Sequence, residues 1–152
     1  PVNSNAEARK SNPAQYVHTC NLLVRKSVMK ACPFDERFVR YGYEDVLLGI
    51  DLIKHGYRLS HVDNPLDFEL FESNADFLSK TEEALHTLHD FQNELEGFSP
   101  LLSLAGRMRT ASPLLRIIYR LIKTPLRDNL KGKAPSLFIF KLYKLLYFLA
   151  LN

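Results

Sequence analysis

Apolar and polar residues follow one another in patterns that predict helices separated by a few extended segments. Residues 16–24, "YVHTCNLLV", are rich in β-branched and aromatic side chains, a composition typical of a buried strand. Residues 57–64, "YRLSHVDN", predict a second strand, which ends at Asn64-Pro65. Because helical patterns lie between and after these strands, we expect an α/β fold with few strands, followed by a mainly helical basic tail.

Helical spacing is clearest in two segments of the first hundred residues. The segment that begins near Glu44 places apolar residues three and four positions apart, which predicts a helix ending at Gly56. A second segment, at about 74–96, carries an apolar stripe and predicts a long helix capped by Ser73 or Asn74.

The character of the chain changes after Ser99. Three apolar and basic segments follow, "SPLLSLAGRM", "SPLLRIIYRLIKTP" and "PSLFIFKLYKLLYFLAL", and each is introduced or cut by proline. We therefore divide the chain into a body, residues 1–98, and a helical tail, residues 99–152.

The formal net charge of +3 conceals a division between these parts. Residues 1–106 contain ten Lys and Arg against sixteen Asp and Glu, a net charge of −6, whereas residues 107–152 contain ten against one, a net charge of +9. An acidic body and a basic tail indicate that the tail has an anionic neighbour. Nucleic acid is disfavoured as that neighbour, because the basic side chains lie among long aliphatic ones rather than in a polar stacking groove.

An anionic membrane face is the neighbour that the tail fits best. The apolar segment 136–151 is shorter than the ~20 residues that a spanning helix needs, so we expect helices lying in the interface of the leaflet. The alternative is that these helices pack on the body and show only their basic edges to water. The residues expected to contact the membrane are Arg116, Arg120, Lys123, Lys141 and Lys144.

Two adjacent carboxylates, Glu44 and Asp45, begin the first of the predicted helices. Acids in a first helical turn are common, because free backbone N–H groups and the helix dipole favour negative charge there. The same position also keeps a carboxylate ionised and fixed in direction, as a general base requires. The preceding Tyr41-Gly42-Tyr43 turn would direct such a base toward a cleft and supply rings to stack on a sugar.

The stretch "CNLLVRKSVMKACPFDERFVRYGYEDVLLGIDLIKHG" resembles the C-terminal half of the catalytic domain of bacterial glycosyltransferase family 2 enzymes. That family has a small-residue-Asn segment, an FDE turn and a GxED helix start in this order. The matching positions are Asn21, Phe34-Asp35-Glu36 and Gly42-Tyr43-Glu44-Asp45. The resemblance covers about residues 16–96, and the tail more loosely.

The resemblance implies a GT-A fold and inverting transfer of a sugar from a nucleotide-sugar donor to an acceptor hydroxyl on a cell-surface glycan or lipid-linked sugar. It makes Asp45 the catalytic base and Glu44 its neighbour. Tyr41, Gly42 and Tyr43 would line the acceptor site, and Asn21 would lie near the donor. The implied location is cytoplasmic, at the inner face of the cell membrane, and the two cysteines agree with a reducing compartment.

Two departures from the family pattern bear on the cofactor. No Asp-x-Asp motif occurs in these residues, so a divalent Mg or Mn would be held mainly by an N-terminal half that this sequence lacks. We therefore interpret the chain as a fragment that does not turn over alone. Phe68 occupies the position of a metal-binding His, and the adjacent Asp67 is a candidate oxygen ligand. The competing interpretation is a non-catalytic module, derived from a transferase, that binds a membrane surface or a partner.

Overall fold

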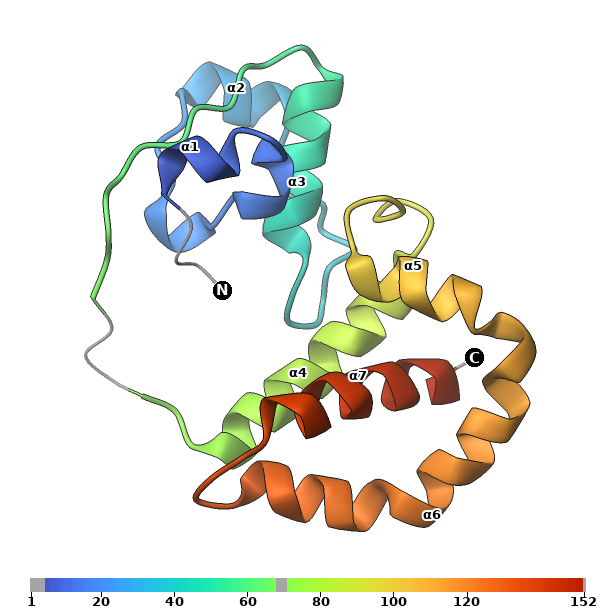
Figure 1. The fold of residues 1–152 in the computed structure, drawn as a ribbon. Helices are drawn as coiled ribbons and strands as arrows, with labels where there is room; N and C mark the ends of the chain where they lie inside the picture. The colour runs from blue at the N-terminus through green and yellow to red at the C-terminus, as the bar shows by residue number, and fades with distance from the viewer. Residues whose placement is uncertain (1–4, 68–70, 152) are drawn as a thin grey trace. The chain divides into compact units, whose positions relative to one another are not determined.

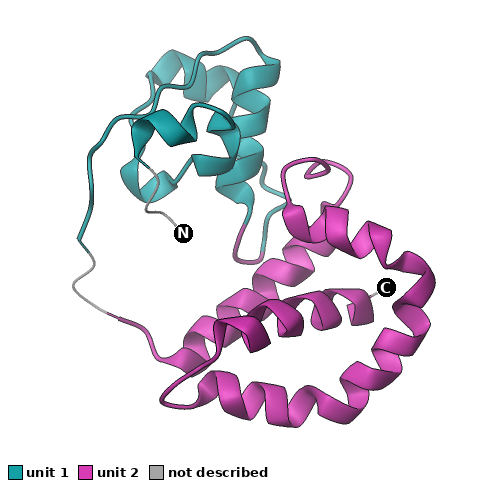
Figure 2. Cartoon of the chain, viewed as in Figure 1, with its two compact units in different colours: residues 1–39, 43–70 teal, residues 40–42, 71–152 magenta. Residues whose placement is uncertain are grey.

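The structure is a computed structural model that describes residues 5–67 and 71–151 (Figure 1). The chain forms two compact units (Figure 2). Unit 1 comprises residues 1–39 and 43–70, and unit 2 comprises residues 40–42 and 71–152. The boundary between the units therefore falls before the long helix that the sequence assigned to the body.

Unit 1 is built around the helix that begins with the acidic pair. Its elements are α1 (Ala6–Arg9), η1 (Pro13–Tyr16), η2 (Thr19–Asn21), α2 (Lys26–Ala31) and α3 (Glu44–Lys54). The buried face of α3 carries Leu47, Leu48, Ile50 and Leu52. At Gly49, α3 approaches η1 so closely that a Cβ atom would lie 2.7 Å from the carbonyl oxygen of Ala14.

The predicted end of α3 is confirmed. Gly56 has a φ of 77°, a left-handed conformation that costs glycine little. The Gly56 N–H donates to the Ile53 carbonyl and the Tyr57 N–H donates to the Leu52 carbonyl, at 2.9 Å each. These two bonds form a Schellman motif, which satisfies carbonyls that the helix end would otherwise leave without donors.

The predicted strands are wrong, and with them the α/β, GT-A-like fold: the described residues form no strand and no sheet. Residues 16–24 contain parts of η1 and η2, and residues 57–64 run without regular structure. Leu22 and Leu59 pack on a cluster formed by Cys32, Leu48 and Leu52. The apolar side chains are thus used for packing on helices.

The segment after α3 is held in place by isolated polar contacts. The Ala6 N–H donates to Asp63 Oδ1 at 2.6 Å, Arg9 Nη2 donates to the Val62 carbonyl at 2.9 Å, and His61 Nε2 lies 3.0 Å from the Pro13 carbonyl oxygen. A strand instead needs a ladder of backbone bonds to a neighbouring strand.

Unit 2 is a helical bundle in which α7 packs against three other helices. Its elements are α4 (Asn74–Asp90), α5 (Pro100–Arg107), η3 (Arg109–Ala111), α6 (Ser112–Lys131) and α7 (Leu137–Leu151). Helix α7 contacts α4, α5 and α6 (Figure 1). The centre of the bundle is a cluster of Leu78, Leu126, Leu130, Tyr143 and Leu146.

The ends of the unit 2 helices agree only partly with the sequence pattern. Ser73 caps α4 as predicted, because its Oγ accepts from the Asp76 N–H at 3.1 Å. Helix α4 ends at Asp90 rather than near residue 96, and α6 continues through Pro125 to Lys131.

A polar network crosses the bundle at its centre. Arg127 of α6 lies 2.5 Å from Glu82 of α4, and the buried Tyr143 hydroxyl of α7 donates to the same carboxylate at 2.5 Å. Arg127 also donates to the Tyr143 oxygen at 3.2 Å. Burial and the bond to Glu82 raise the pKa of Tyr143, so its hydroxyl remains a donor at neutral pH.

Candidate functional site

The predicted base, Asp45, lies in the first turn of α3 and is fixed through one of its oxygens. Asp45 Oδ1 accepts from the Val46 N–H at 2.8 Å. The other oxygen, Oδ2, lies 3.5 Å from Nδ1 of His18, and the Asp45 side chain is 23% exposed. The carboxylate is therefore oriented by its own helix, and the side chain is partly accessible to solvent.

The residues that flank Asp45 are unusual in backbone and in burial. Tyr43, the N-cap of α3, has a φ of 68°, a left-handed conformation that an L-residue with a Cβ adopts at a cost of about 1–2 kcal/mol. Glu44 Oε2 is buried and has no hydrogen-bond partner among the described residues. Strained backbone and unsatisfied buried polar atoms are both enriched at functional sites.

His18 is the residue near Asp45 that the sequence did not identify. It is the N-cap of η2, and its side chain is 44% exposed. Because η2 and α3 are far apart in sequence, no spacing motif joins the two residues. Only the packing of the N-terminal segment on α3 places the imidazole and the carboxylate together.

Two further predicted site residues of unit 1 are Asn21, which is hydrogen-bonded to Asn64, and Asp67, which is exposed. The Asn21 amide donates to the Asn64 carbonyl at 2.8 Å and accepts from the Asn64 amide at 3.2 Å. Asp67 is exposed, and Phe68 lies outside the described residues.

A divalent metal does not fit the residues that the structure describes in this part of the chain. Within 5–67 and 71–151, no group of three or more His, Cys, Asp or Glu side chains could hold a metal ion. Asp67 alone supplies at most one carboxylate, whereas Mg²⁺ and Mn²⁺ prefer several oxygen ligands.

Tyr41 and Gly42 belong to unit 2, where they pack on α4. The Tyr41 carbonyl accepts from Thr87 Oγ1 at 3.0 Å, and Lys80 Nζ lies 5.8 Å from the centre of the Tyr41 ring. Gly42 has a φ of 99°, and a Cβ atom there would lie 2.7 Å from the Cβ of Ala84. The positive φ of Gly42 and its close approach to Ala84 explain why glycine occupies this turn, and neither feature involves a substrate.

The five basic residues that the sequence assigned to a membrane differ in their surroundings. Arg116 donates from Nε to Ser112 Oγ at 3.3 Å and to the Leu149 carbonyl at 3.1 Å, so it joins α6 to α7. Lys144 is half-buried over the Phe140 ring, and burial lowers its pKa. The remaining three, which are exposed, are Arg120, Lys123 and Lys141.

The outer side of α6 carries apolar residues as well as basic ones. Leu114, Ile117 and Leu121 are 62%, 56% and 76% exposed, and their spacing places them on one face of the helix. We call these three residues the α6 strip. None of the helices in the described part of the chain is both long enough and apolar enough to cross a bilayer.

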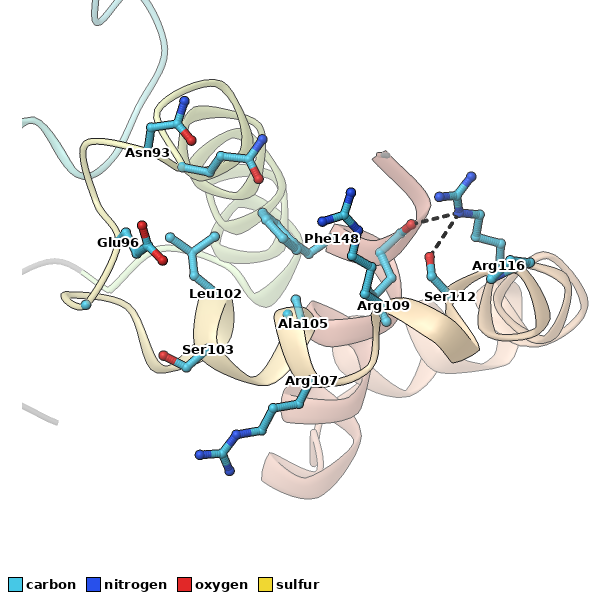
Figure 3. A pocket seen from close by; sticks show the side chains of 15 residues that line it. Asn93, Glu96, Leu102, Ser103, Ala105, Arg107, Arg109, Ser112, Arg116 and Phe148 are labelled. Carbon is cyan, nitrogen blue, oxygen red and sulfur yellow. Dashed lines mark hydrogen bonds between the residues drawn. The ribbon is translucent and has the colours of Figure 1, made fainter.

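A cavity in unit 2 is lined by three arginines that form no ion pair with a carboxylate among the described residues. It is lined by residues of the segment that follows α4, of α5, of η3, of the start of α6 and of the end of α7, and has a volume of about 950 Å³ (Figure 3). Its lining includes Arg107, Arg109 and Arg116, with Glu96 as its one acidic residue. We call this cavity the arginine basin. The sequence showed the basic character of the tail but did not indicate that these arginines line one cavity.

Comparison of the chain with protein-family models, with curated proteins and with solved structures found no match in any of the three.

Proposed function

We propose that Asp45 is the general base in an inverting transfer of a sugar from a nucleotide-sugar donor to an acceptor hydroxyl. The proposal takes the acid pair and the reaction class from the resemblance to glycosyltransferase family 2, and it does not include the sheet of that family. Unit 1 would supply the acceptor side of the reaction.

The reaction needs one base and no protein nucleophile. The acceptor oxygen forms a bond to the anomeric carbon while the bond from that carbon to the diphosphate oxygen breaks. The acceptor proton passes to Asp45 Oδ2, and the nucleoside diphosphate leaves with the electron pair. Configuration inverts because a single displacement occurs.

The observation that carries the proposal is the orientation of the Asp45 carboxylate. Its Oδ1 accepts from the Val46 N–H, its Oδ2 lies 3.5 Å from His18 Nδ1, and the side chain is 23% exposed. Glu44, the neighbour of Asp45, has a buried Oε2 without a hydrogen-bond partner among the described residues.

The test is Asp45→Asn in the full-length gene product, assayed for release of nucleoside diphosphate from a panel of nucleotide sugars. Loss of the base should lower the rate of transfer about 10²- to 10⁴-fold. Donor binding, measured by calorimetry, should change little. Asp51→Asn, the same substitution farther along α3, is the matched control and should remain active. Full activity of Asp45→Asn would remove this residue from the mechanism.

A second candidate function, docking on an anionic membrane surface, is favoured by the exposed α6 strip. Leu114, Ile117 and Leu121 face away from the bundle core in a segment with ten basic residues and one acidic residue. Such a surface matches a leaflet interface, where apolar side chains enter the acyl region and Lys and Arg meet the headgroups.

Vesicle flotation of the chain tests this candidate. Leu121→Gln should reduce binding to vesicles containing phosphatidylglycerol about tenfold, because it removes an apolar side chain worth about 1.5 kcal/mol on transfer from water. Leu104→Gln, at a less exposed leucine of α5, is the matched control. Equal losses in both variants, or equal binding to neutral phosphatidylcholine, would reject specific docking by the strip.

A further inference from the structure

The arginine basin combines an open cavity with guanidinium groups that lack acidic partners. Arg107, Arg109 and Arg116 line it, and none of them forms an ion pair with a carboxylate among the described residues. Arg127, on the same helix as Arg116, is by contrast paired with Glu82 at 2.5 Å. Positive charge gathered without compensation disfavours the folded state unless an anion is bound.

Arg116 is already oriented for such an anion. Its Nε is occupied by Ser112 Oγ and the Leu149 carbonyl, as the dashed lines of Figure 3 show. The two terminal nitrogens of this half-buried guanidinium have no partner among the described residues, so they remain available as donors. An arginine fixed through Nε loses less conformational entropy when it binds a ligand.

The other walls of the basin fit an anion that carries an organic group. Gln92 and Asn93 line the cavity with amide groups, and the largely buried Phe148 also belongs to its lining. Glu96 also lines the cavity and would repel an anion placed beside it. The ligand would therefore lie toward Arg109 and Arg116, away from that carboxylate.

We propose that the arginine basin binds the phosphate group of an organic phosphate, with Arg109 and Arg116 as its main donors. Planar guanidinium groups bind phosphate oxygens through paired N–H donors, and an exposed tetrahedral dianion matches two such groups. This site lies wholly within unit 2 and does not depend on the role proposed for Asp45. Its phosphate can come from a phospholipid headgroup or from a soluble phosphate ester.

The test begins with a titration of the chain by inorganic phosphate at constant ionic strength, followed through the arginine Nε–H signals in NMR spectra. Saturable shifts are expected for Arg116 and Arg109. Arg109→Gln should weaken binding about tenfold, because one charge-assisted donor is lost. Lys131→Gln, on α6 but outside the basin, removes the same charge from an exposed position and should leave binding unchanged. Arg109 is exposed, so its replacement leaves the packing of the bundle intact.

A parallel titration with vesicles containing phosphatidic acid identifies the source of the phosphate. If Arg109→Gln weakens vesicle binding about tenfold and Lys131→Gln does not, the ligand is a lipid headgroup. If only binding of free phosphate depends on Arg109, the ligand is soluble. Shifts that do not saturate, or equal losses in both variants under both conditions, would overturn the proposal, because they describe a diffuse basic surface.

Discussion

Replacing Tyr143 by phenylalanine tests whether the polar network at the centre of unit 2 stabilises the bundle. The Tyr143 side chain is fully buried, and its hydroxyl donates to Glu82 at 2.5 Å and accepts from Arg127 at 3.2 Å. Phenylalanine keeps the ring and its packing, and it removes only the hydroxyl.

The expected loss follows from what the substitution leaves behind. A hydrogen bond to a charged group contributes about 1.5–3 kcal/mol. Glu82 and Arg127 remain 2.5 Å apart after the change, so no charge loses its partner and the loss should lie in the lower part of that range. We expect the free energy of unfolding of unit 2 to fall by about 2 kcal/mol.

Hydrogen exchange read by mass spectrometry isolates unit 2 from unit 1, because peptides from α7 report on the bundle alone. A loss of about 2 kcal/mol should accelerate exchange of the slowest α7 amides about 30-fold. Tyr41→Phe is the matched control, because the exposed Tyr41 hydroxyl makes no hydrogen bond among the described residues. Unchanged exchange in Tyr143→Phe, or the same acceleration in both variants, would refute the reasoning.

Three further outcomes can be measured on the same chain. Gly49→Ala should lower the stability of unit 1 by about 1–3 kcal/mol in urea unfolding, because the new Cβ would lie 2.7 Å from the backbone of η1. Gly106→Ala is the control: its Cβ would meet open space, so it should raise the melting temperature slightly. Burial, and to a smaller extent the bond to Glu82, raises the pKa of Tyr143 above the value of 10.0 for unfolded tyrosine. The free energy of unfolding should therefore be at its full value below pH 10.0 and should decline as the pH rises toward the pKa of the folded state. A thiol reagent should modify only the exposed Cys20 in the native chain and also the buried Cys32 in urea.

Local signals in the sequence were sufficient for the helix ends that depend on a single residue. Gly56 ends α3 through its left-handed backbone, and Ser73 caps α4 through its hydroxyl. The strand predictions were wrong because composition alone does not show which element an apolar residue packs against. Leu22 and Leu59 are apolar because they pack on α3, and that burial requires no neighbouring strand. Strand propensity describes residues that fit a half-buried surface, and here helices supply that surface.

Only part of the candidate site could be predicted from local sequence. Glu44 and Asp45 could be assigned to a helix start, because acids in a first turn have a local cause. The approach of His18 to within 3.5 Å of Asp45 depends on how the N-terminal segment packs against α3, and no spacing in the sequence encodes it.

The sequence gives the net charge of the tail, and the structure shows which of its charged groups a partner can reach. Residues 107–152 have a net charge of +9, yet that charge is not uniformly available to a partner. Arg127 is neutralised by Glu82, Arg116 is tied to α7, and burial lowers the pKa of Lys144. An anion that approaches unit 2 therefore meets the arginine basin and the exposed edge of α6 as separate features, each with its own geometry. For this reason Arg109→Gln and Lys131→Gln, which remove equal charge, should differ in their effect on phosphate binding, and a model based on net charge alone predicts that they do not.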